Sequence, residues 1–421
     1  MSNKIKVAVI GLGYVGLPLA VELGKKYSTI GFDINKKRIL ELKKKKDTTK
    51  ELSLNQIKKS KKIRFTHNID EIKFCNFYII AVPTPIDKKK KPRLKMLKDA
   101  TYLVANILKK KDIVVYESTV YPGLTEEYCV PILEKKSKLK VNKDFSVGYS
   151  PERINVGDKK HTLTNIKKIV SASNNKSLNI INNLYKSIIK AGTYMASSIK
   201  VAEAAKVIEN SQRDINIALI NELSIIFSKL GIDTNEVIDA AKTKWNFIPF
   251  YPGIVGGHCI GVDPYYLSYK AEKAGYKSKI ILAGRKLNDE MGNYIAKEVL
   301  RLIRAKTKFN KSLKIAILGI SFKENCGDIR NTRVIDIREY FLRKNIKCDV
   351  YDPVVDKKEV FNKYGIKMKP LSNIYSSKYN GVIIAVKHNE FKKLALEKFG
   401  SNCIIYDVKS LYKKNETTAR L

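Results

Sequence analysis

Short runs of apolar residues recur along the chain, and each run ends in a polar or glycine-rich turn. The first run covers residues 7–10, the next covers 28–32, and two more lie at 77–82 and 113–117. A run of this length is typical of a strand that is buried on both faces of a parallel sheet. We expect residues 145–148 to form the last strand of this sheet.

The later part of the chain has helical spacing. Residues 198–230 contain neither glycine nor proline and predict one long helix. Residues 267–304 predict a further helical region, which a polar break at 306–312 ends. The tail after Leu411 is polar, so we expect it to fray.

After this break the chain repeats its own beginning. Residues 314–319 (KIAILG) echo residues 6–11 (KVAVIG), and runs at 349–352 and 382–386 follow in the same order as in the first part. The fold class that this repetition predicts is α/β, with two Rossmann-like doubly wound domains joined by a central helical region.

The length of 421 residues is too great for one ordinary hydrophobic core. We therefore expect three domains, at residues 1–196, 197–304 and 312–421.

The composition adds a strong positive charge. The chain has 81 Lys plus Arg against 41 Asp plus Glu, a formal net charge of +40. Such a balance raises nucleic acid as a partner. The lysines are spread along the whole chain, whereas nucleic-acid readers concentrate arginine and aromatic residues on one element. A solvated lysine-rich surface is therefore the favoured interpretation, with no nucleic acid as partner.

Six cysteines are scattered without a C-x-x-C pair or histidine at ligand spacing. This pattern argues against a metal site and against a disulfide framework, and favours a reducing cytosol.

The N-terminal apolar stretch is interrupted by glycines and Pro18, which is unlike a signal peptide. No apolar segment reaches the roughly 18 residues that span a bilayer, so we expect a cytoplasmic protein without a membrane partner.

The turn after the first run has the spacing G-x-G-x-x-G, formed by Gly11, Gly13 and Gly16 with Tyr14 and Val15 between them. A strand before it and a helix after it are the context in which this turn binds the pyrophosphate of a dinucleotide at the helix N-terminus.

Asp33 ends the second run, about 20 residues after this turn, where an acid accepts the ribose hydroxyls of NAD. NAD is favoured over NADP, although the basic residues Lys36, Lys37 and Arg38 keep NADP open.

Three further runs have polar exits. Thr84 and Thr119 follow the runs at 77–82 and 113–117, and Glu152 and Arg153 follow the run at 145–148. Ligands of open α/β sheets bind beyond the carboxyl ends of the strands, so these side chains are candidates for the dinucleotide site. Isolated threonines at such places are also ordinary turn residues.

The long predicted helix carries Lys206, Asn210 and Arg213 at one-turn spacing, which places them on one face.

A glycine-rich loop, residues 251–265, lies a little past the middle of the chain. It carries Cys259 between Gly256–Gly257 and Asp263. Small neighbours expose a thiol, and a thiolate is a strong nucleophile. The alternative is a buried inert cysteine.

These features in this order resemble the UDP-glucose/GDP-mannose dehydrogenase family. The resemblance covers nearly the whole chain and rests on G-G-H-C-I-x-V-D-P-Y at 256–265 and F-K-x-x-x-G-D-x-R at 322–330. The segments at 150–154, 252–267 and 282–288 are most similar to the UDP-N-acetylhexosamine 6-dehydrogenase branch, the type of Vi-polysaccharide and capsule biosynthesis.

The resemblance implies an NAD-dependent, four-electron oxidation of the sugar C6 alcohol to a carboxylate, with two NAD used in succession. Cys259 would form a thiohemiacetal and then a thioester. Lys206 and Asn210 would stabilise the developing oxyanion, Thr119 and Asp263 would hold a water that acts as base, and Glu152 would assist hydrolysis.

By the same resemblance, each ligand has its own set of residues. The N-terminal domain would bind NAD, the central domain would carry the cysteine loop, and the C-terminal domain would bind the UDP-sugar. The NAD contacts would come from Gly11, Gly13, Tyr14, Val15, Gly16, Asp33, Arg38, Thr84, Thr119 and Arg330. The sugar nucleotide would contact Glu152, Arg153, Ile154, Lys206, Asn210, Arg213, Gly256 and Lys323.

Two positions depart from the UDP-glucose enzymes. Val156 stands where they carry a second acid after Glu152, and Phe250 stands where they carry a lysine, which favours an N-acetylated sugar. UDP-GlcNAc and UDP-GalNAc are the expected substrates, with UDP-glucose or UDP-ManNAc as alternatives. His258 is expected to be a bystander, because adjacent residues of an extended segment face opposite ways.

Two other functions are alternatives to this one, and the sequence also suggests an oligomeric state. A two-electron β-hydroxyacid dehydrogenase would have no use for Cys259 or for a second Rossmann-like half. A basic nucleic-acid-binding protein with a Rossmann core is the non-enzyme alternative. The long helix also suggests a homodimer.

Overall fold

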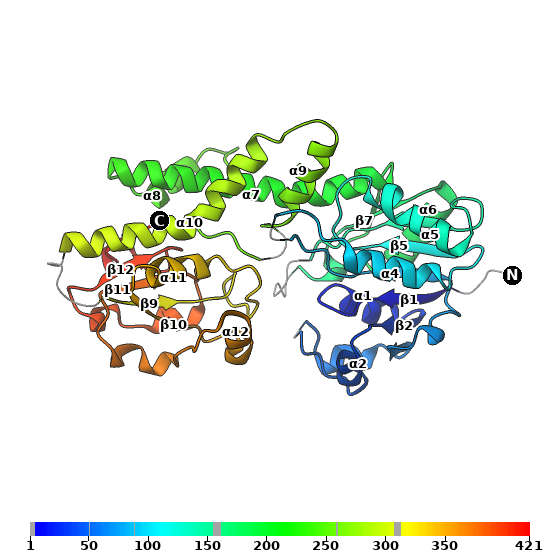
Figure 1. Ribbon diagram of the computed structural model, residues 1–421, viewed down its shortest axis with the longest axis horizontal. Helices are drawn as coiled ribbons and strands as arrows, with labels where there is room; N and C mark the ends of the chain where they lie inside the picture. The colour runs from blue at the N-terminus through cyan, green and yellow to red at the C-terminus, as the bar shows by residue number, and fades with distance from the viewer. Residues whose placement is uncertain (1–4, 50, 88, 155–160, 258–259, 307–312) are drawn as a thin grey trace. The chain divides into compact units, whose positions relative to one another are not determined.

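The computed structural model describes residues 5–49, 51–87, 89–154, 161–257, 260–306 and 313–421 (Figure 1). The chain forms two compact units, each built around one sheet. The first unit comprises Met1–Glu209 and Tyr265–Tyr276, and the second comprises Asn210–Pro264 and Lys277–Leu421. The predicted α/β class with two Rossmann-like folds is confirmed.

The first unit contains an eight-stranded sheet in the order β3-β2-β1-β4-β5-β6-β7-β8. Its neighbouring strands are parallel except for the antiparallel pair β6 and β7. The strands are β1 (Lys6–Ile10), β2 (Ser28–Phe32), β3 (Ile63–Thr66), β4 (Phe77–Ile80), β5 (Ile113–Tyr116), β6 (Ser146–Tyr149), β7 (Lys168–Ala172) and β8 (Thr193–Met195).

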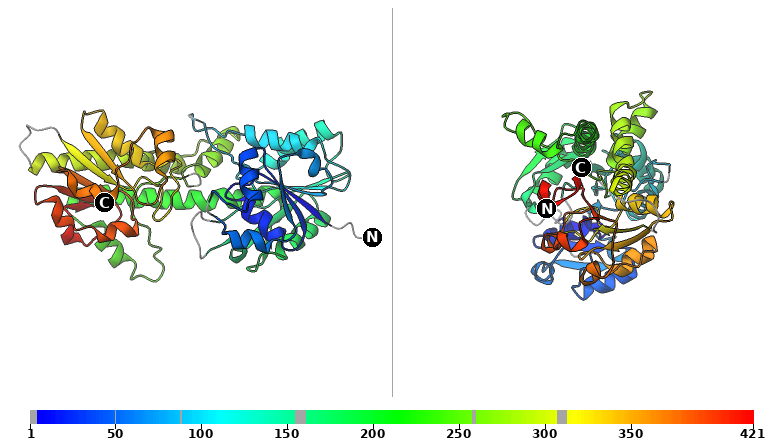
Figure 2. Two further views of the ribbon diagram at one scale, coloured as in Figure 1. Left: turned by 90° about the horizontal axis from the view of Figure 1, so that it is seen from below. Right: turned by 90° about the vertical axis from the view of Figure 1, so that its left-hand side faces the viewer.

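Helices cover both faces of this sheet, as Figure 2 shows. They are α1 (Gly16–Leu23), α2 (Lys36–Lys43), α3 (Leu54–Lys59), α4 (Lys95–Ala105), α5 (Val130–Ser137) and α6 (Asn175–Lys186). Val7 and Val9 of β1 share one core cluster with the apolar residues of α1 and α6. On the other face, the Tyr116 hydroxyl lies 3.2 Å from Thr101 Oγ1 of α4. The alternation along each strand therefore fills two separate layers.

Two of the three boundaries between the units fall within helices, α7 (Ile199–Leu230) and α9 (Asp263–Lys273), and the third follows Tyr276. The predicted long helix at 198–230 is thus confirmed. The region expected to be helical at 267–304 is divided between α9 and α10 (Ile280–Lys306). Gly275, with φ of +85°, lies between the two helices in a conformation that favours glycine over other residues.

The second unit has a five-stranded parallel sheet in the order β10-β9-β11-β12-β13. Its strands are β9 (Lys314–Leu318), β10 (Lys347–Tyr351), β11 (Gly381–Ile384), β12 (Ile404–Asp407) and β13 (Ala419–Arg420). Besides α10 it contains α8 (Thr234–Ala241), α11 (Val334–Leu342) and α12 (Lys357–Tyr364). In β9, Ile315 and Ile317 pack with α10 and α11, whereas Ala316 and Leu318 belong to the cluster on the opposite face.

Two sequence expectations are wrong. Residues 145–148 do not form the last strand, because β7 and β8 extend the first sheet beyond β6. The tail after Leu411 is not frayed: β13 pairs with β12, and Arg420 Nε lies 2.6 Å from Asp233 Oδ2 at the N-cap of α8. A polar tail can be ordered when its charges meet fixed partners, and composition alone does not reveal those partners.

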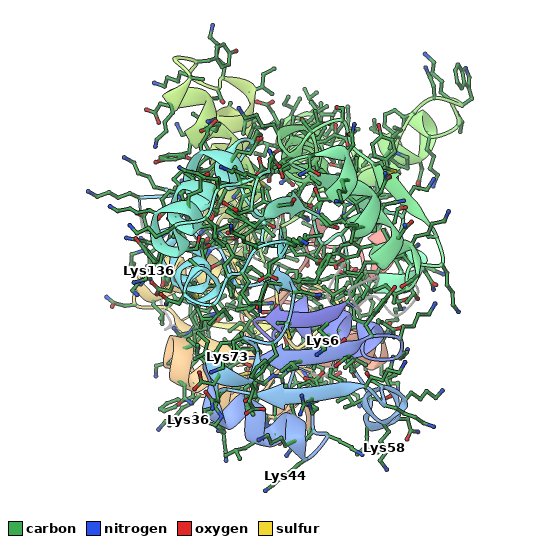
Figure 3. The ribbon with its side chains drawn as sticks, turned by 90° about the vertical axis from the view of Figure 1, so that its right-hand side faces the viewer. Lys6, Lys36, Lys44, Lys58, Lys73 and Lys136 are labelled. Atoms are coloured by element: carbon green, nitrogen blue, oxygen red, sulfur yellow. The ribbon has the colours of Figure 1, made fainter. Side chains whose placement is uncertain are left out.

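Lysine side chains project from many elements of the first unit (Figure 3). The labelled ones come from β1, α2, α3, α5 and the turns after α2 and η1 (Ile69–Glu71), namely Lys6, Lys36, Lys44, Lys58, Lys73 and Lys136. No single helix within the described ranges is both long enough and apolar enough to cross a membrane.

Candidate active site

The three glycines of the first turn differ in why they are needed. A Cβ on Gly11, which has φ of +94°, would lie 2.8 Å from the Ala81 carbonyl oxygen, and a Cβ on Gly16 would lie 1.8 Å from the Gly11 carbonyl oxygen. A Cβ on Gly13 would meet no protein atom within 4 Å. Packing therefore requires Gly11 and Gly16, whereas the bare backbone at Gly13 faces open space that fits a pyrophosphate. Tyr14 and Val15 complete the turn, with Val15 at the N-cap of α1.

Asp33 fixes this turn from the end of β2. Its Oδ2 atom accepts a hydrogen bond of 2.9 Å from the Leu12 N–H, and its Oδ1 atom accepts one of 2.9 Å from the Asn35 N–H. The carboxylate therefore lies beside the glycine turn, at the position from which an acid binds a ribose. The residues present fit NAD.

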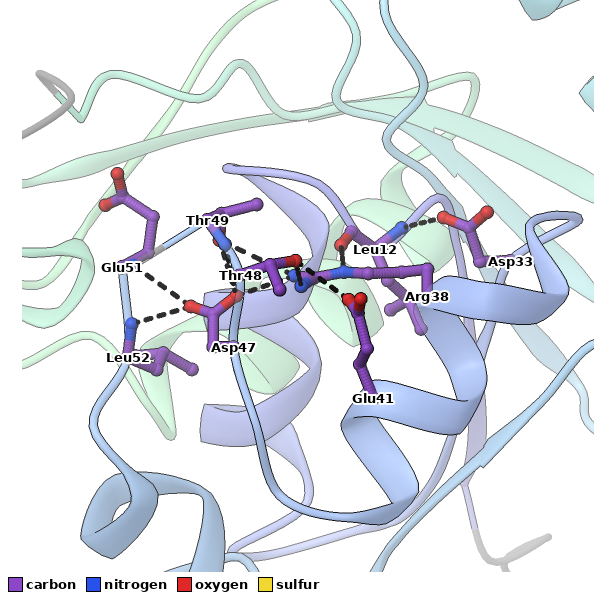
Figure 4. A network of polar contacts seen from close by, with 9 residues as sticks. All are labelled: Leu12, Asp33, Arg38, Glu41, Asp47, Thr48, Thr49, Glu51 and Leu52. Atoms are coloured by element: carbon purple, nitrogen blue, oxygen red, sulfur yellow. Dashed lines mark hydrogen bonds and ion pairs between the residues drawn. The ribbon is translucent and has the colours of Figure 1, made fainter. Parts of the chain in front are cut away.

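Arg38 lies behind the same turn, in the network of Figure 4. Its Nε atom donates to the Leu12 carbonyl oxygen at 3.0 Å, and its Nη2 atom lies 2.8 Å from Asp47 Oδ1. Asp47 in turn accepts the N–H groups of Glu51 and Leu52 at 3.0 and 2.9 Å. The guanidinium is thus engaged within the protein and supports the loop beside the turn.

The two predicted threonines lie close together, after the adjacent strands β4 and β5. The Thr84 hydroxyl donates to the Thr119 carbonyl oxygen at 2.7 Å, and the Tyr266 hydroxyl of α9 donates to the Thr84 carbonyl oxygen at 2.8 Å. The loop after Thr119 is also tied to α7, since Glu203 accepts the N–H groups of Gly123 and Thr125. Burial raises the pKa of Glu203 to about 7, although these N–H groups oppose the shift.

Glu152 is held firmly at the exit of β6. Its Oε1 atom accepts the N–H groups of Arg153 and Ile154 at 2.6 and 2.8 Å, and its Oε2 atom lies 3.1 Å from Lys168 Nζ. The Arg153 guanidinium lies 2.7 Å from Glu209 of α7. Val156 lies outside the described residues.

α7 presents the predicted pair at one-turn spacing. Lys206 is buried, with 7% of its surface exposed. The Asn210 side-chain amide donates to Asp263 Oδ2 at 2.6 Å, and Asp263 is 1% exposed. This bond orients the amide, so that its oxygen and its second N–H are fixed in direction. Arg213, further along α7, is exposed to solvent.

Cys259 and His258 lie outside the described residues. The glycines before them pack against the second fold: a Cβ on Gly256 would lie 3.0 Å from the Phe322 side chain, and Gly257 has φ of +84° and accepts a 3.2 Å hydrogen bond from the Asn331 amide. The loop that leads to the cysteine is therefore anchored on the segment that carries Lys323.

Four of the described cysteines have the character of inert thiols. Burial raises the pKa of Cys75 to about 11 and that of Cys129, Cys348 and Cys403 to about 12. Within the described ranges, no group of three or more His, Cys, Asp or Glu side chains could hold a metal ion.

A small pocket of the second unit lies beside the same segment. Its volume of about 50 Å³ has room for roughly three to five water molecules, which suits a phosphate-sized group. Its lining includes Gly256, Lys323, Arg333, Lys387 and Lys409. The sequence analysis named Gly256 and Lys323 and missed Lys387 and Lys409, because neither lies in a recognisable motif.

The cationic groups of this region differ in how they are engaged. Burial, with Lys387 nearby, lowers the pKa of Lys409, and its Nζ atom lies 3.4 Å from the Pro252 carbonyl oxygen. Arg333 is paired with Asp336 at 2.8 Å, and Arg330 lies 2.9 Å from Asp328 Oδ2. The two arginines are therefore engaged by carboxylates, and Lys323, Lys387 and Lys409 are the other cationic side chains of the lining, which also includes Glu324.

His388 is a third residue that the sequence did not reveal. It is fully buried, and its Nδ1 atom accepts the Asn325 N–H at 2.9 Å. Its Nε2 atom lies 3.1 Å from both Asp352 Oδ2 and Ser321 Oγ. Because Nδ1 is an acceptor, Nε2 carries the proton and donates it, so the ring ties the segment around Lys323 to the end of β10.

Two nucleotide-type folds in one chain, the first fitted to NAD and the second carrying a cationic pocket, define an NAD-dependent dehydrogenase whose substrate bears a nucleotide. The sequence comparisons agree. The NAD binding, central and UDP binding domains of one family match residues 5–189, 200–290 and 316–414. The chain belongs to the UDP-glucose/GDP-mannose dehydrogenase family, as the sequence motifs predicted.

The chain is similar to individual members over its full length. It is 54% identical to a UDP-N-acetyl-D-glucosamine 6-dehydrogenase of Salmonella typhi, covering 100% of this chain and 99% of the other. It is 52% identical to a protein of the same name from Pseudomonas aeruginosa, covering 100% of both. Among solved structures, a UDP-D-ManNAc dehydrogenase from Pyrococcus horikoshii superimposes with a TM-score of 0.87 at 28% identity, covering 99% and 98% of the two chains.

The different demands on the turn glycines give a testable contrast. Gly13→Ala should leave the melting temperature nearly unchanged and weaken NAD binding at least tenfold, because its methyl group would occupy open space where the pyrophosphate binds. Gly16→Ala should destabilise the fold by about 1–3 kcal/mol through overpacking. Thermal melting and NAD titration check both. An unchanged NAD affinity in Gly13→Ala would contradict the placement.

The role of His388 predicts a selective loss. His388→Leu should raise the KM for the sugar nucleotide at least fivefold and leave the KM for NAD unchanged. The Asn325 N–H would lose its acceptor and the Ser321 oxygen would lose the donor from the ring, so that Ser321 keeps only its bond to the Lys323 carbonyl oxygen. His67→Leu, which changes an exposed histidine of the first unit, is the matched control. An equal rise in both KM values would argue against a local effect on the pocket.

Proposed function

We propose that the chain oxidises the C6 hydroxyl of a UDP-N-acetylhexosamine, UDP-GlcNAc or UDP-GalNAc, to the carboxylate, with two NAD consumed per sugar. The observation that carries this proposal is the full-length identity of 52–54% to two UDP-N-acetyl-D-glucosamine 6-dehydrogenases. UDP-glucose and UDP-ManNAc are the alternative substrates. The product would serve surface polysaccharide synthesis.

The proposed reaction divides four electrons between two oxidations. NAD, when bound, supplies the hydride acceptor for each of them. A base first removes the hydroxyl proton as the alcohol becomes an aldehyde, and the Cys259 thiolate then adds to the aldehyde carbon to give a thiohemiacetal. The second oxidation gives a thioester, and water releases the carboxylate and restores the thiol.

Each polar side chain has a task in this scheme. The Lys206 ammonium and the Asn210 amide donate to the oxygen that becomes anionic, and the bond from Asn210 to Asp263 fixes the direction of the amide. Thr119 and Asp263 hold the water that acts as base. Glu152 assists hydrolysis of the thioester.

The two ligands have the contacts assigned from the sequence. NAD contacts Gly11, Gly13, Tyr14, Val15, Gly16, Asp33, Arg38, Thr84, Thr119 and Arg330, with Arg38 acting chiefly as support for the turn. The sugar nucleotide contacts Glu152, Arg153, Ile154, Lys206, Asn210, Arg213, Gly256 and Lys323, and we add Lys409. The three domains proposed for these tasks are residues 1–196, 197–304 and 312–421.

The alternatives of another class have less support. A two-electron β-hydroxyacid dehydrogenase gives no task to the UDP binding domain at residues 316–414. A nucleic-acid-binding role gives no task to either ligand fold, and the lysines lie on many separate elements. We propose that the protein acts in the cytoplasm without nucleic acid or membrane as partner.

Counting NADH tests the reaction directly. With UDP-GlcNAc limiting and NAD in excess, two NADH per sugar are expected, and the product should be the uronate. Cys259→Ala should reduce the overall rate at least a thousandfold, since no thioester forms, while the binding of both ligands persists. One NADH per sugar, or full turnover by Cys259→Ala, would overturn the mechanism.

We also propose a homodimer that uses α7. Leu219, Ile226 and Leu230 are 43–65% exposed and recur at helical spacing along one stripe of this helix. Leu219→Glu together with Ile226→Glu should therefore yield monomers by light scattering, and Lys229→Glu is the charge control on the same helix. A monomeric mass for the unaltered chain would refute the dimer.

A further inference from the structure

A buried ionic cluster lies at the exit of β6 and includes two residues that the proposed mechanism does not use. Lys168 Nζ, on β7, lies 3.0 Å from Glu117 Oε2 and 3.1 Å from Glu152 Oε2. The three side chains are 3%, 0% and 8% exposed for Lys168, Glu117 and Glu152. A single ammonium is therefore shared between two carboxylates away from bulk water.

The side of the cluster away from Glu152 is fixed by an aromatic residue. The Tyr185 hydroxyl of α6 donates to Glu117 Oε1, and Lys168 Nζ lies 5.5 Å from the centre of the Tyr185 ring. Burial raises the pKa of Tyr185 well above its ordinary value, which keeps this hydroxyl a donor. Glu117 and Tyr185 therefore hold the ammonium in one place.

The other side of the cluster ends at the mechanism's own carboxylate. Glu152 Oε1 is occupied by the N–H groups of Arg153 and Ile154, and Lys168 occupies Oε2. The charged and titratable groups around Glu152 are thus Lys168, Glu117 and Tyr185, with Arg153 directed to Glu209. Removing Lys168 frees one carboxylate oxygen to rotate and leaves two buried carboxylates facing each other.

We propose that Lys168 is a positioning residue for hydrolysis: it fixes the direction and the negative charge of the Glu152 carboxylate, while Glu117 and Tyr185 fix Lys168. This inference rests on the proposed function, because the proposed function gives Glu152 its role in releasing the thioester. It also assigns to β7 a task in the chemistry, although this strand carries no recognised motif.

Removal of Lys168 alone leaves two buried carboxylates without a cation, which can prevent folding, so the test removes the charge in a balanced way. The variant Glu117→Gln with Lys168→Met keeps the net charge of the cluster. Lys168→Arg keeps the cation. Lys168→Gln, like the double variant, has a neutral side chain at position 168, but it retains Glu117. Lys167→Met changes the exposed neighbouring lysine as a control. All are made in the full chain, and their melting temperatures are measured with and without NAD.

The readouts are the kcat and KM values for UDP-GlcNAc and NAD, and the fraction of enzyme carrying an acyl group during turnover, measured by intact mass after acid quenching. The double variant should lower kcat at least tenfold, change neither KM more than twofold, and accumulate acylated enzyme. Lys168→Arg should retain kcat within about threefold.

The outcomes separate this inference from the proposed function. If the unaltered protein forms one NADH per sugar, the proposed function fails and this role of Lys168 fails with it. If it forms two, but the folded neutral variants show unchanged kcat and no acylated enzyme, only the positioning role is overturned. Failure of both neutral variants to fold would overturn it too, because the ammonium would then serve folding and not positioning.

Discussion

Both sheets depend on one interaction. A carboxylate directly after β2 in the first unit, and directly after β10 in the second, accepts hydrogen bonds from the N–H groups of the turn that follows the neighbouring strand, β1 or β9. In the first unit Asp33 accepts the N–H of Leu12. In the second, Asp352 accepts the N–H groups of Ile320 and Ser321. Bonds from a charged acceptor contribute about 1.5–3 kcal/mol each, enough to fix a turn that has no regular partner.

The two turns share further details that the repeated sequence encodes. The N–H of Gly11 donates to the Phe32 carbonyl oxygen, and that of Gly319 donates to the Tyr351 carbonyl oxygen. At the N-terminal end of β1, the Asn76 side chain accepts a hydrogen bond of 2.9 Å from the Lys6 N–H. At the N-terminal end of β9, the Asn380 side chain accepts one of 2.9 Å from the Lys314 N–H. The second fold is therefore built on the same backbone contacts as the first.

What differs is the use of the space above the turn. In the first unit, the place beside Gly13 is open and fits a pyrophosphate. At the corresponding place in the second unit stands Ser321, whose hydroxyl meets the ring of His388, and the same ring lowers the pKa of Asp352 against the opposing effect of burial. The second turn is thus closed by protein side chains, and its ligand must meet the neighbouring lysines instead. This explains how one scaffold serves two different nucleotide ligands.

The sequence predicted what depends on local pattern and missed what depends on distant partners. Buried strands, the glycine turn, the long helix and the repeated half follow from apolar runs and glycine spacing, and all are present. His388, Lys409 and Lys168 lie in no motif, and their importance comes from residues tens of positions away that folding brings within hydrogen-bond distance. β7 and β13 were missed for the same reason, because the pairing that defines each of them comes from its neighbour in the sheet, and β13 has only two residues.

The buried acids show why such residues escape a motif search. Glu203, Glu117 and Glu152 lose solvation when the protein folds, and each offsets this loss through donors that are fixed by the fold. Backbone N–H groups can come from any residue type except proline, so the sequence around a carboxylate contains little signal of whether the carboxylate will be satisfied. A buried carboxylate with all its donors in place cannot turn easily, and that rigidity is what a reacting thioester would require of a neighbouring base. In this chain, the contacts that stabilise the loops beyond the strands therefore also orient the groups proposed to act on the substrate.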